Sequence, residues 1–162
     1  MKSRGSNKRN DRRIKERRKD TYKNLSAIPE NAVCKDCGAT FINGHWTWKE
    51  REQHFYKTIC PACKRTEDNY PAGLIEIKGK FFNEHSDEIS NLIKNTEKLE
   101  KNERPLERIM FIKKEIGSII VTTTGIHIAR RIGEALRRSY QGLFSFQYGQ
   151  GEKSIRVVWE RQ

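Results

Sequence analysis

Four cysteines in two CxxC pairs constrain this chain more than any other feature. The pairs are Cys34-Lys-Asp-Cys37 and Cys60-Pro-Ala-Cys63, with 22 residues between them. Two thiolates three residues apart can hold one side of a tetrahedral metal ion, and a second pair completes a shell of four sulfur ligands. Because the protein then fills all four positions, none remains for a catalytic water. The spacing therefore predicts one structural Zn²⁺ site formed by Cys34, Cys37, Cys60 and Cys63.

The predicted zinc ribbon covers residues 33–72. Such a site contributes an apparent binding free energy of about 10–16 kcal/mol at neutral pH, which is enough to fold a segment with little apolar core. The alternative is a redox-active pair of cysteines. It is disfavoured because thioredoxin-type chemistry uses a single CxxC at the start of a helix.

The charge of the chain is concentrated at its N-terminus. The 162 residues carry 33 Lys and Arg against 21 Asp and Glu, a formal net charge of +12. Residues 1–23 hold eleven basic and three acidic side chains, a net charge of +8, and few apolar groups. Such a segment cannot offset the entropy cost of ordering. We therefore expect a disordered basic tail, with residues 1–32 forming tail and connector.

A positive charge of this size indicates a polyanionic partner, most often nucleic acid. The alternative is that the tail only keeps the protein soluble, a role that acidic residues serve better than basic ones. We expect the tail to contact RNA phosphates. The predicted contacts are Arg4, Lys8, Arg9, Arg12, Arg13, Arg17 and Arg18.

Aromatic and basic side chains interleave between the two CxxC pairs. This pattern is typical of modules that stack bases while contacting phosphates. The alternative, favoured for most of these rings, is that they cover the zinc module; the rings are Trp46, Trp48 and Phe55. The predicted RNA contacts in this segment are Lys49, Arg51 and Lys57.

Residues 73–162 alternate strand and helix signals. The predicted elements are strand 73–79, helix 84–103, strands 106–113 and 118–123, helix 125–140, and a hairpin of strands 143–148 and 154–159. This β-α-β-β-α-β-β order predicts an α+β chain in which the zinc ribbon precedes a ferredoxin-like (split βαβ) domain with an extra C-terminal strand. Asn83 or Ser86 is expected to cap the first helix, and Thr124 the second.

The second predicted helix carries four arginines. Arg130, Arg131, Arg137 and Arg138 have spacings that place them on one strip, with a single acid, Glu134, among them. The alternative is an ordinary solvated face, although such faces usually mix both signs of charge. We expect this strip to bind RNA or another polyanion. The threonines at 122–124 precede the helix and are expected to help hold a phosphate.

Several classes of protein are disfavoured. The longest aliphatic or aromatic run, Ile109 to Ile112, is far shorter than the ~20 residues of a membrane helix, and no secretory h-region follows the basic N-terminus. We therefore expect a cytoplasmic protein with reduced cysteines and no membrane partner. Residues 149–154 lack the adjacent Gly-Lys-Ser/Thr of a phosphate-binding loop, and no other catalytic motif stands out. We expect neither enzyme activity nor a small-molecule substrate.

Three motifs resemble those of the nuclear export adaptor family for the large (60S) ribosomal subunit. They are Cys60-Pro-Ala-Cys63 with Pro71-Ala-Gly73, then Thr122-Thr-Thr before Ile128-Ala-Arg-Arg-Ile-Gly, and Ser154-Ile-Arg-Val-Val158. The similarity spans roughly residues 34–160, and the chain looks like a small bacterial relative with one zinc site rather than several. The resemblance implies binding to the large subunit, on the face that meets the small one. It does not extend to nuclear export, since the long C-terminal region with transport signals has no counterpart here.

These features predict a ribosome-associated, RNA-binding zinc-ribbon factor in the assembly, protection or hibernation of ribosomes. Its expected partner is ribosomal RNA or a ribosomal subunit, in the first place the large one. Two alternatives stay open. One is a DNA-binding regulator or protein-interaction adaptor. The other, less favoured, is an enzyme that acts on RNA or protein, with structural zinc and an active site between the two modules.

Overall fold

The computed structural model describes residues 20, 22, 28–50 and 56–162. Within this part the architecture is α+β, with two mixed sheets and four helices, as the α+β prediction requires. The predictions that concern residues 1–19, 21, 23–27 and 51–55 lie outside the described residues. They comprise the expected disorder of the tail, the ring of Phe55, and the RNA contacts Arg4, Lys8, Arg9, Arg12, Arg13, Arg17, Arg18 and Arg51.

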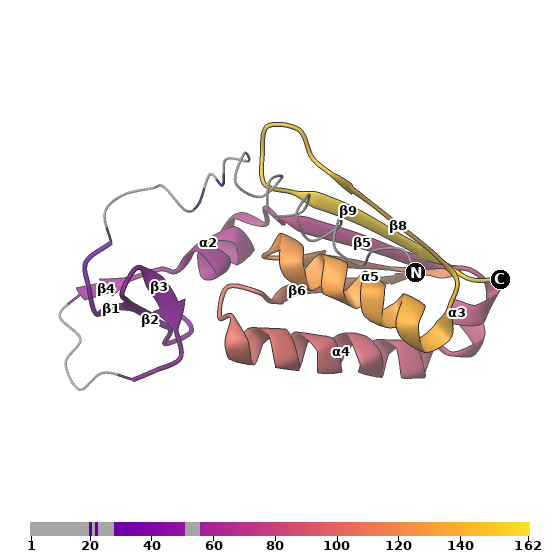
Figure 1. Cartoon of the computed structure of the whole chain (residues 1–162), viewed down its shortest axis with the longest axis horizontal. Coiled ribbons are helices and arrows are strands. Elements are labelled where there is room, and N and C mark those ends of the chain that lie inside the picture. Colours follow the sequence, from indigo (N-terminus) through magenta and orange to yellow (C-terminus); the bar gives the residue numbers. More distant parts are fainter. Residues whose placement is uncertain (1–19, 21, 23–27, 51–55) are drawn as a thin grey trace, which may run out of the picture.

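The smaller sheet belongs to the cysteine module, at the left of Figure 1. Its strands run in the order β3-β2-β1-β4, and their bounds are β1 Ala32–Cys34, β2 Thr40–Ile42, β3 His45–Thr47 and β4 Tyr56–Thr58. β1 and β4 are parallel, whereas β1–β2 and β2–β3 are antiparallel. Each strand has three residues, and the buried apolar cluster here consists of two alanines and two of the cysteines. So small a core gives little hydrophobic stabilisation.

Helix α2 (Pro61–Asp68) connects the cysteine module to the larger domain. Proline at its first position is favourable because that residue needs no backbone donor. The helix ends at Asn69, which adopts the left-handed conformation with a φ of 51°.

The larger domain is a five-stranded sheet with helices on one face (Figure 1). The strands run in the order β6-β7-β5-β9-β8, and their bounds are β5 Gly73–Lys78, β6 Ile109–Glu115, β7 Ser118–Thr123, β8 Leu143–Tyr148 and β9 Ile155–Glu160. The helices are α3 Lys80–Glu84, α4 Ser86–Glu103 and α5 Ile126–Tyr140. All seven predicted elements are thus present, and α3 was not predicted as a separate helix.

The main core lies between this sheet and helices α4 and α5. Alternate residues of the central strands point into it, among them Ile75, Val121 and Val157, and α5 contributes Ile128 and Ile132. Burial of each such side chain favours folding by about 1.5–3 kcal/mol. Packing on this core fixes the positions of α5 and β8 relative to each other, and thereby those of the charged side chains described below.

The extra C-terminal strand lies inside the sheet. β9 pairs with β5 in parallel and with β8 in antiparallel orientation. In a split βαβ sheet, the strand that follows the second helix (here β8) would lie next to the first strand (here β5). In this sheet β9 lies next to β5 instead, and β8 is at the edge. The pairs β5–β7 and β6–β7 are antiparallel.

The three predicted helix caps are wrong. The N-cap of α4 is His85, and it makes no side-chain capping bond, so neither Asn83 nor Ser86 caps that helix. The short α3 takes up Asn83 and shifts the start of α4. The N-cap of α5 is Gly125 rather than Thr124, whose hydroxyl bonds the 106–108 segment instead.

Candidate metal centre and its surroundings

The four cysteines converge on one point. Their sulfur atoms all lie within 4.8 Å of one another, and Cys37 Sγ is 3.8 Å from Cys60 Sγ. Cys34 and Cys60 are buried, and Cys37 and Cys63 are half-buried. Such a group could hold a metal ion.

Backbone amides point at two of these sulfurs. The amide of Cys60 donates to Cys34 Sγ at 3.3 Å, and the amide of Cys63 donates to Cys60 Sγ at 3.4 Å. Cys60 is also the N-cap of α2, so the second CxxC pair does stand at a helix start, as in a redox pair. The presence of two further thiols on the same point distinguishes this cluster from a lone CxxC.

Arg108 covers one side of the thiol cluster. Its guanidinium donates to Cys63 Sγ at 3.2 Å, to Cys37 Sγ at 3.1 Å and to Cys60 Sγ at 3.4 Å. Arg108 thus contacts three of the four sulfurs of the cluster. The residue comes from the segment just before β6, so the larger domain supplies a positive charge to the thiol group. No spacing or composition signal in the sequence indicated this contact.

The thiols are coupled to one another. The pKa of Cys37 is lowered to about 4, chiefly by its hydrogen bond with Cys60 Sγ and further by the Arg108 charge. The pKa of Cys60 is raised by the same bond and by burial. A metal cation that binds here would displace the thiol protons, because ligating cysteines are thiolates.

Trp48 joins the cysteine module to α4. Its indole Nε1 donates to the carbonyl of Lys101 at 2.6 Å, and the Arg108 guanidinium lies 5.6 Å from its ring centroid. Trp46 and Trp48 also pack against the cysteine cluster. The covering interpretation therefore holds for these two rings.

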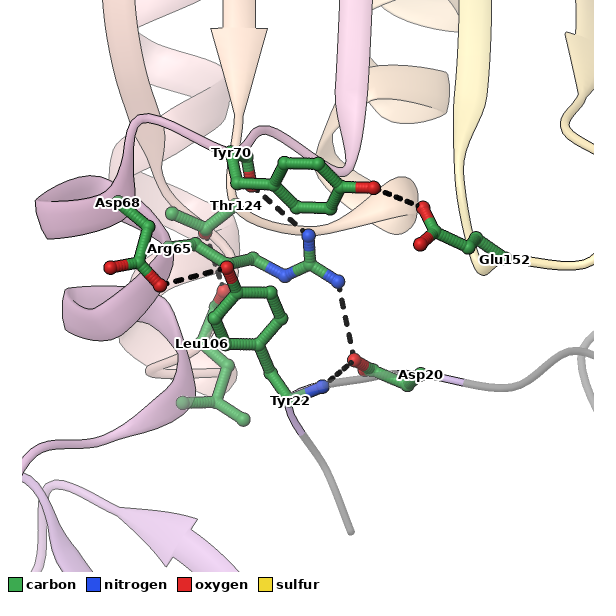
Figure 2. A network of polar contacts seen from close by, with 8 residues as sticks. All are labelled: Asp20, Tyr22, Arg65, Asp68, Tyr70, Leu106, Thr124 and Glu152. Atoms are coloured by element: carbon green, nitrogen blue, oxygen red, sulfur yellow. Dashed lines mark hydrogen bonds and ion pairs between the residues drawn. The ribbon is translucent and has the colours of Figure 1, made fainter. Parts of the chain in front are cut away.

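A second network, shown in Figure 2, surrounds Arg65. The Arg65 side chain is 5% exposed and donates to Asp20 Oδ1 at 3.2 Å and to the carbonyl of Tyr70 at 3.1 Å. Its guanidinium also lies 4.4 Å from the ring centroid of Tyr22. Tyr70 in turn donates its hydroxyl to Glu152 in the β8–β9 connection. The network connects Asp20 and Tyr22 at the end of the tail with α2 and with the β8–β9 hairpin.

The start of α5 is occupied by a carboxylate. Glu107 is buried, and its Oε2 accepts from the amide of Ile128 at 3.1 Å. Thr123 and Thr124 are buried as well, with their hydroxyls bonded to backbone carbonyls. Glu107 therefore occupies the helix end where the threonines were expected to help hold a phosphate.

The four predicted arginines of α5 divide between two sides of the helix. Arg131 turns towards α4, with its Nε 3.6 Å from Glu100 Oε1. The others line a groove between α5 and β8 of about 500 Å³, which we call the α5–β8 groove. Its lining residues are Arg130, Glu134, Arg137, Arg138, Gln141, Phe144 and Phe146.

The last two predicted RNA contacts among the described residues, Lys49 and Lys57, are exposed on the cysteine module. Lys49 directly follows Trp48, and Lys57 lies in β4. Their side chains are accessible to a partner.

Comparison with protein families, curated proteins and solved structures finds no match to this chain. Among the described residues, no helix combines the length and apolarity that crossing a membrane requires.

Proposed function

We propose that this protein is a zinc-dependent RNA-binding factor of the ribosome. The observation that carries the proposal is the placement of its positive charge. A tail with a net charge of +8 in residues 1–23 is joined to a body whose arginines Arg137 and Arg138 are exposed and make no ion pair with any described residue. Charge concentrated at two separate places suits a long polyanion better than a small ligand.

Zinc is the ion that suits the thiol cluster best. Four thiolates at a Zn–S distance of about 2.3 Å form a tetrahedron with edges of about 3.8 Å. The Cys37–Cys60 sulfur separation of 3.8 Å has this length. When bound, the ion would cross-link β1, the β1–β2 turn and α2, so its role is to fold the ribbon. All four cysteines serve as ligands, and Arg108 offsets part of the negative charge of the thiolates.

The ribosomal assignment rests on the resemblance of three motifs to the export adaptors of the large subunit. It makes ribosomal RNA on that subunit the first partner to test, with the protein acting in the cytoplasm. We likewise interpret the larger domain as a split βαβ variant into which β9 is inserted. The predicted tail contacts, Lys49, Lys57 and the α5 arginines would then all meet RNA.

Gradient sedimentation of the tagged full chain from a lysate tests this proposal. We expect co-migration with the large ribosomal subunit, lost after ribonuclease treatment or in high salt. Migration with protein complexes that resist nuclease would instead identify an adaptor, and migration with DNA a regulator.

The tail is tested by deleting residues 2–19. These carry ten basic and two acidic side chains, a net charge of +8 of the total +12. The deletion must stop before Asp20, because that carboxylate is the partner of the buried Arg65. We expect weaker ribosome binding with an unchanged zinc content. An undiminished affinity would remove the tail from the proposal.

A further inference from the structure

The α5–β8 groove combines rings with positive charge. Strand alternation places Phe144, Phe146 and Tyr148 on one face of β8, and neighbouring ring centroids in this row are 5.6 Å apart. Phe146 is 40% exposed although it is a large apolar side chain. Among the described strands β8 pairs only with β9, so it forms an edge of the sheet and the row lies at that edge.

The arginines of the groove have two different roles. Arg130 is held by Glu134 at 3.0 Å and by the Tyr148 hydroxyl at 3.1 Å, and its guanidinium lies 4.9 Å from the Phe146 centroid. It therefore fixes the ring from one side. Arg137 and Arg138, about two turns further along α5, are exposed and remain available for an anion.

The opposite face of the sheet lacks this combination. Its lysines and arginine are paired with acids: Lys78 and Arg156 with Glu76, and Lys113 with Glu115. In the described strands that face carries one ring, Phe111, which is 56% exposed. Unpaired positive charge beside a row of rings is found in the groove and not on the open face.

We propose that the α5–β8 groove binds unpaired bases of RNA, an inference that rests on the proposed function and specifies its ligand. A base stacks on the exposed part of Phe146, and flanking phosphates contact Arg137 and Arg138. Stacking on aromatic rings requires bases with exposed faces. An A-form duplex hides its base faces, so it would be held by the phosphates alone. The groove is therefore a site for loops and single-stranded segments.

Fluorescence anisotropy with the zinc-loaded full chain tests the groove. The probes are a labelled 12-nucleotide single-stranded RNA without internal pairing and a 12-base-pair RNA duplex. We expect the single strand to bind more tightly. Phe146→Ala should weaken its binding by about tenfold, since stacking contributes about 1–3 kcal/mol per base. Arg137→Gln should lower the slope of log affinity against log salt by about one.

Matched controls come from the opposite face of the sheet. Phe111→Ala and Arg156→Gln change an exposed ring and an exposed arginine of the same kinds, and neither should alter binding of the single strand by more than about twofold. Circular dichroism and zinc content confirm that each variant is folded. Equal losses for Phe146→Ala and Phe111→Ala, or equal affinity for strand and duplex, would overturn the proposal. Binding of an acidic peptide in place of RNA, with the same dependence on Phe146, would also overturn it and assign the groove to a protein.

The same variants in the sedimentation assay separate the two proposals. Co-migration of the wild type with ribosomes, together with no effect of Phe146→Ala on the labelled strand, overturns the groove and leaves the proposed function standing. The converse result, a Phe146-dependent strand complex without ribosome association, supports the groove and overturns the ribosomal assignment.

Discussion

At the scale of single residues, Arg108 is the side chain on which the candidate metal centre depends beyond its ligands. It donates to three sulfurs at 3.1–3.4 Å and stands over Trp48. A planar fork can contact several sulfurs at once, which the point charge of lysine cannot do. Through Arg108, the larger domain places a positive charge beside the thiol cluster.

We therefore expect Arg108→Lys to lower the zinc affinity of the chain by about 10–100-fold, the usual cost of losing an outer partner of metal ligands. Competition with a chromogenic chelator measures this affinity. Arg156→Gln serves as the control, because this arginine has a side chain that is 69% exposed and pairs with Glu76. Zinc affinities that are equal in all three proteins would contradict the role of Arg108.

Glu107 gives the stability of the protein a pH dependence. Burial raises the pKa of this carboxyl above its ordinary value, against the opposing effect of the Ile128 amide. The folded state therefore holds the proton more tightly than the unfolded state, so this group lowers the free energy of unfolding as pH rises from about 4.3 through the folded pKa.

Glu107→Gln should abolish this contribution while keeping an oxygen for the Ile128 amide. Urea unfolding at a series of pH values tests it: the difference between variant and wild type should shift in favour of the variant as pH rises from 4 to 7. A difference that stays constant across this range would show that Glu107 does not titrate during unfolding.

At the scale of elements, the sequence patterns predicted the strands and helices but not the helix caps or the position of β9 in the sheet. Strand alternation and helical periodicity located all five long strands and the helices at 86–103 and 126–140 to within a few residues. The helix caps were predicted from residue type alone, whereas tertiary contacts decided them: Thr124 bonds the 106–108 segment. The insertion of β9 beside β5 is equally a long-range choice. The cysteine cluster was predictable because the spacing of its ligands is local. Arg108 reaches the cysteines, and Phe146 reaches the α5–β8 groove, only because the folded chain brings distant segments together.

The close approach of α5 to the sheet depends on Gly133. A methyl group there would lie 2.8 Å from Val157 Cγ1 and still closer to the Phe144 ring. We expect Gly133→Ala to destabilise the protein by about 1–3 kcal/mol through overpacking, although alanine has the higher helix propensity. Thermal unfolding measures the change, with the exposed Ser139→Ala on the same helix as the control. A variant more stable than the wild type would show that the helix and sheet can separate at no cost.

At the scale of the whole molecule, Arg65 connects three segments that are distant in sequence. Asp20→Asn removes the carboxylate from a guanidinium that is almost fully buried. We expect a loss of about 1–3 kcal/mol in the free energy of unfolding, as for other hydrogen bonds of charged groups. The exposed pair Lys64–Glu67, with 3.9 Å between its charged atoms, provides the control, because Glu67→Gln should change the stability by less than about 1 kcal/mol. Equal effects of the two variants in urea unfolding would mean that Asp20 does not anchor the tail.

In the proposed function, the cationic tail, the cysteine module with its bound zinc and the arginine-lined groove of the sheet domain together hold one large RNA. Equilibrium binding to purified large ribosomal subunits over a salt series tests this claim most directly. If the tail and the α5 arginines together neutralise about six phosphates, log affinity should fall linearly with log salt with a slope of about −4 to −5, and deletion of residues 2–19 should make the slope shallower. Affinity that is unchanged by salt, or absent at every salt concentration, would contradict the account.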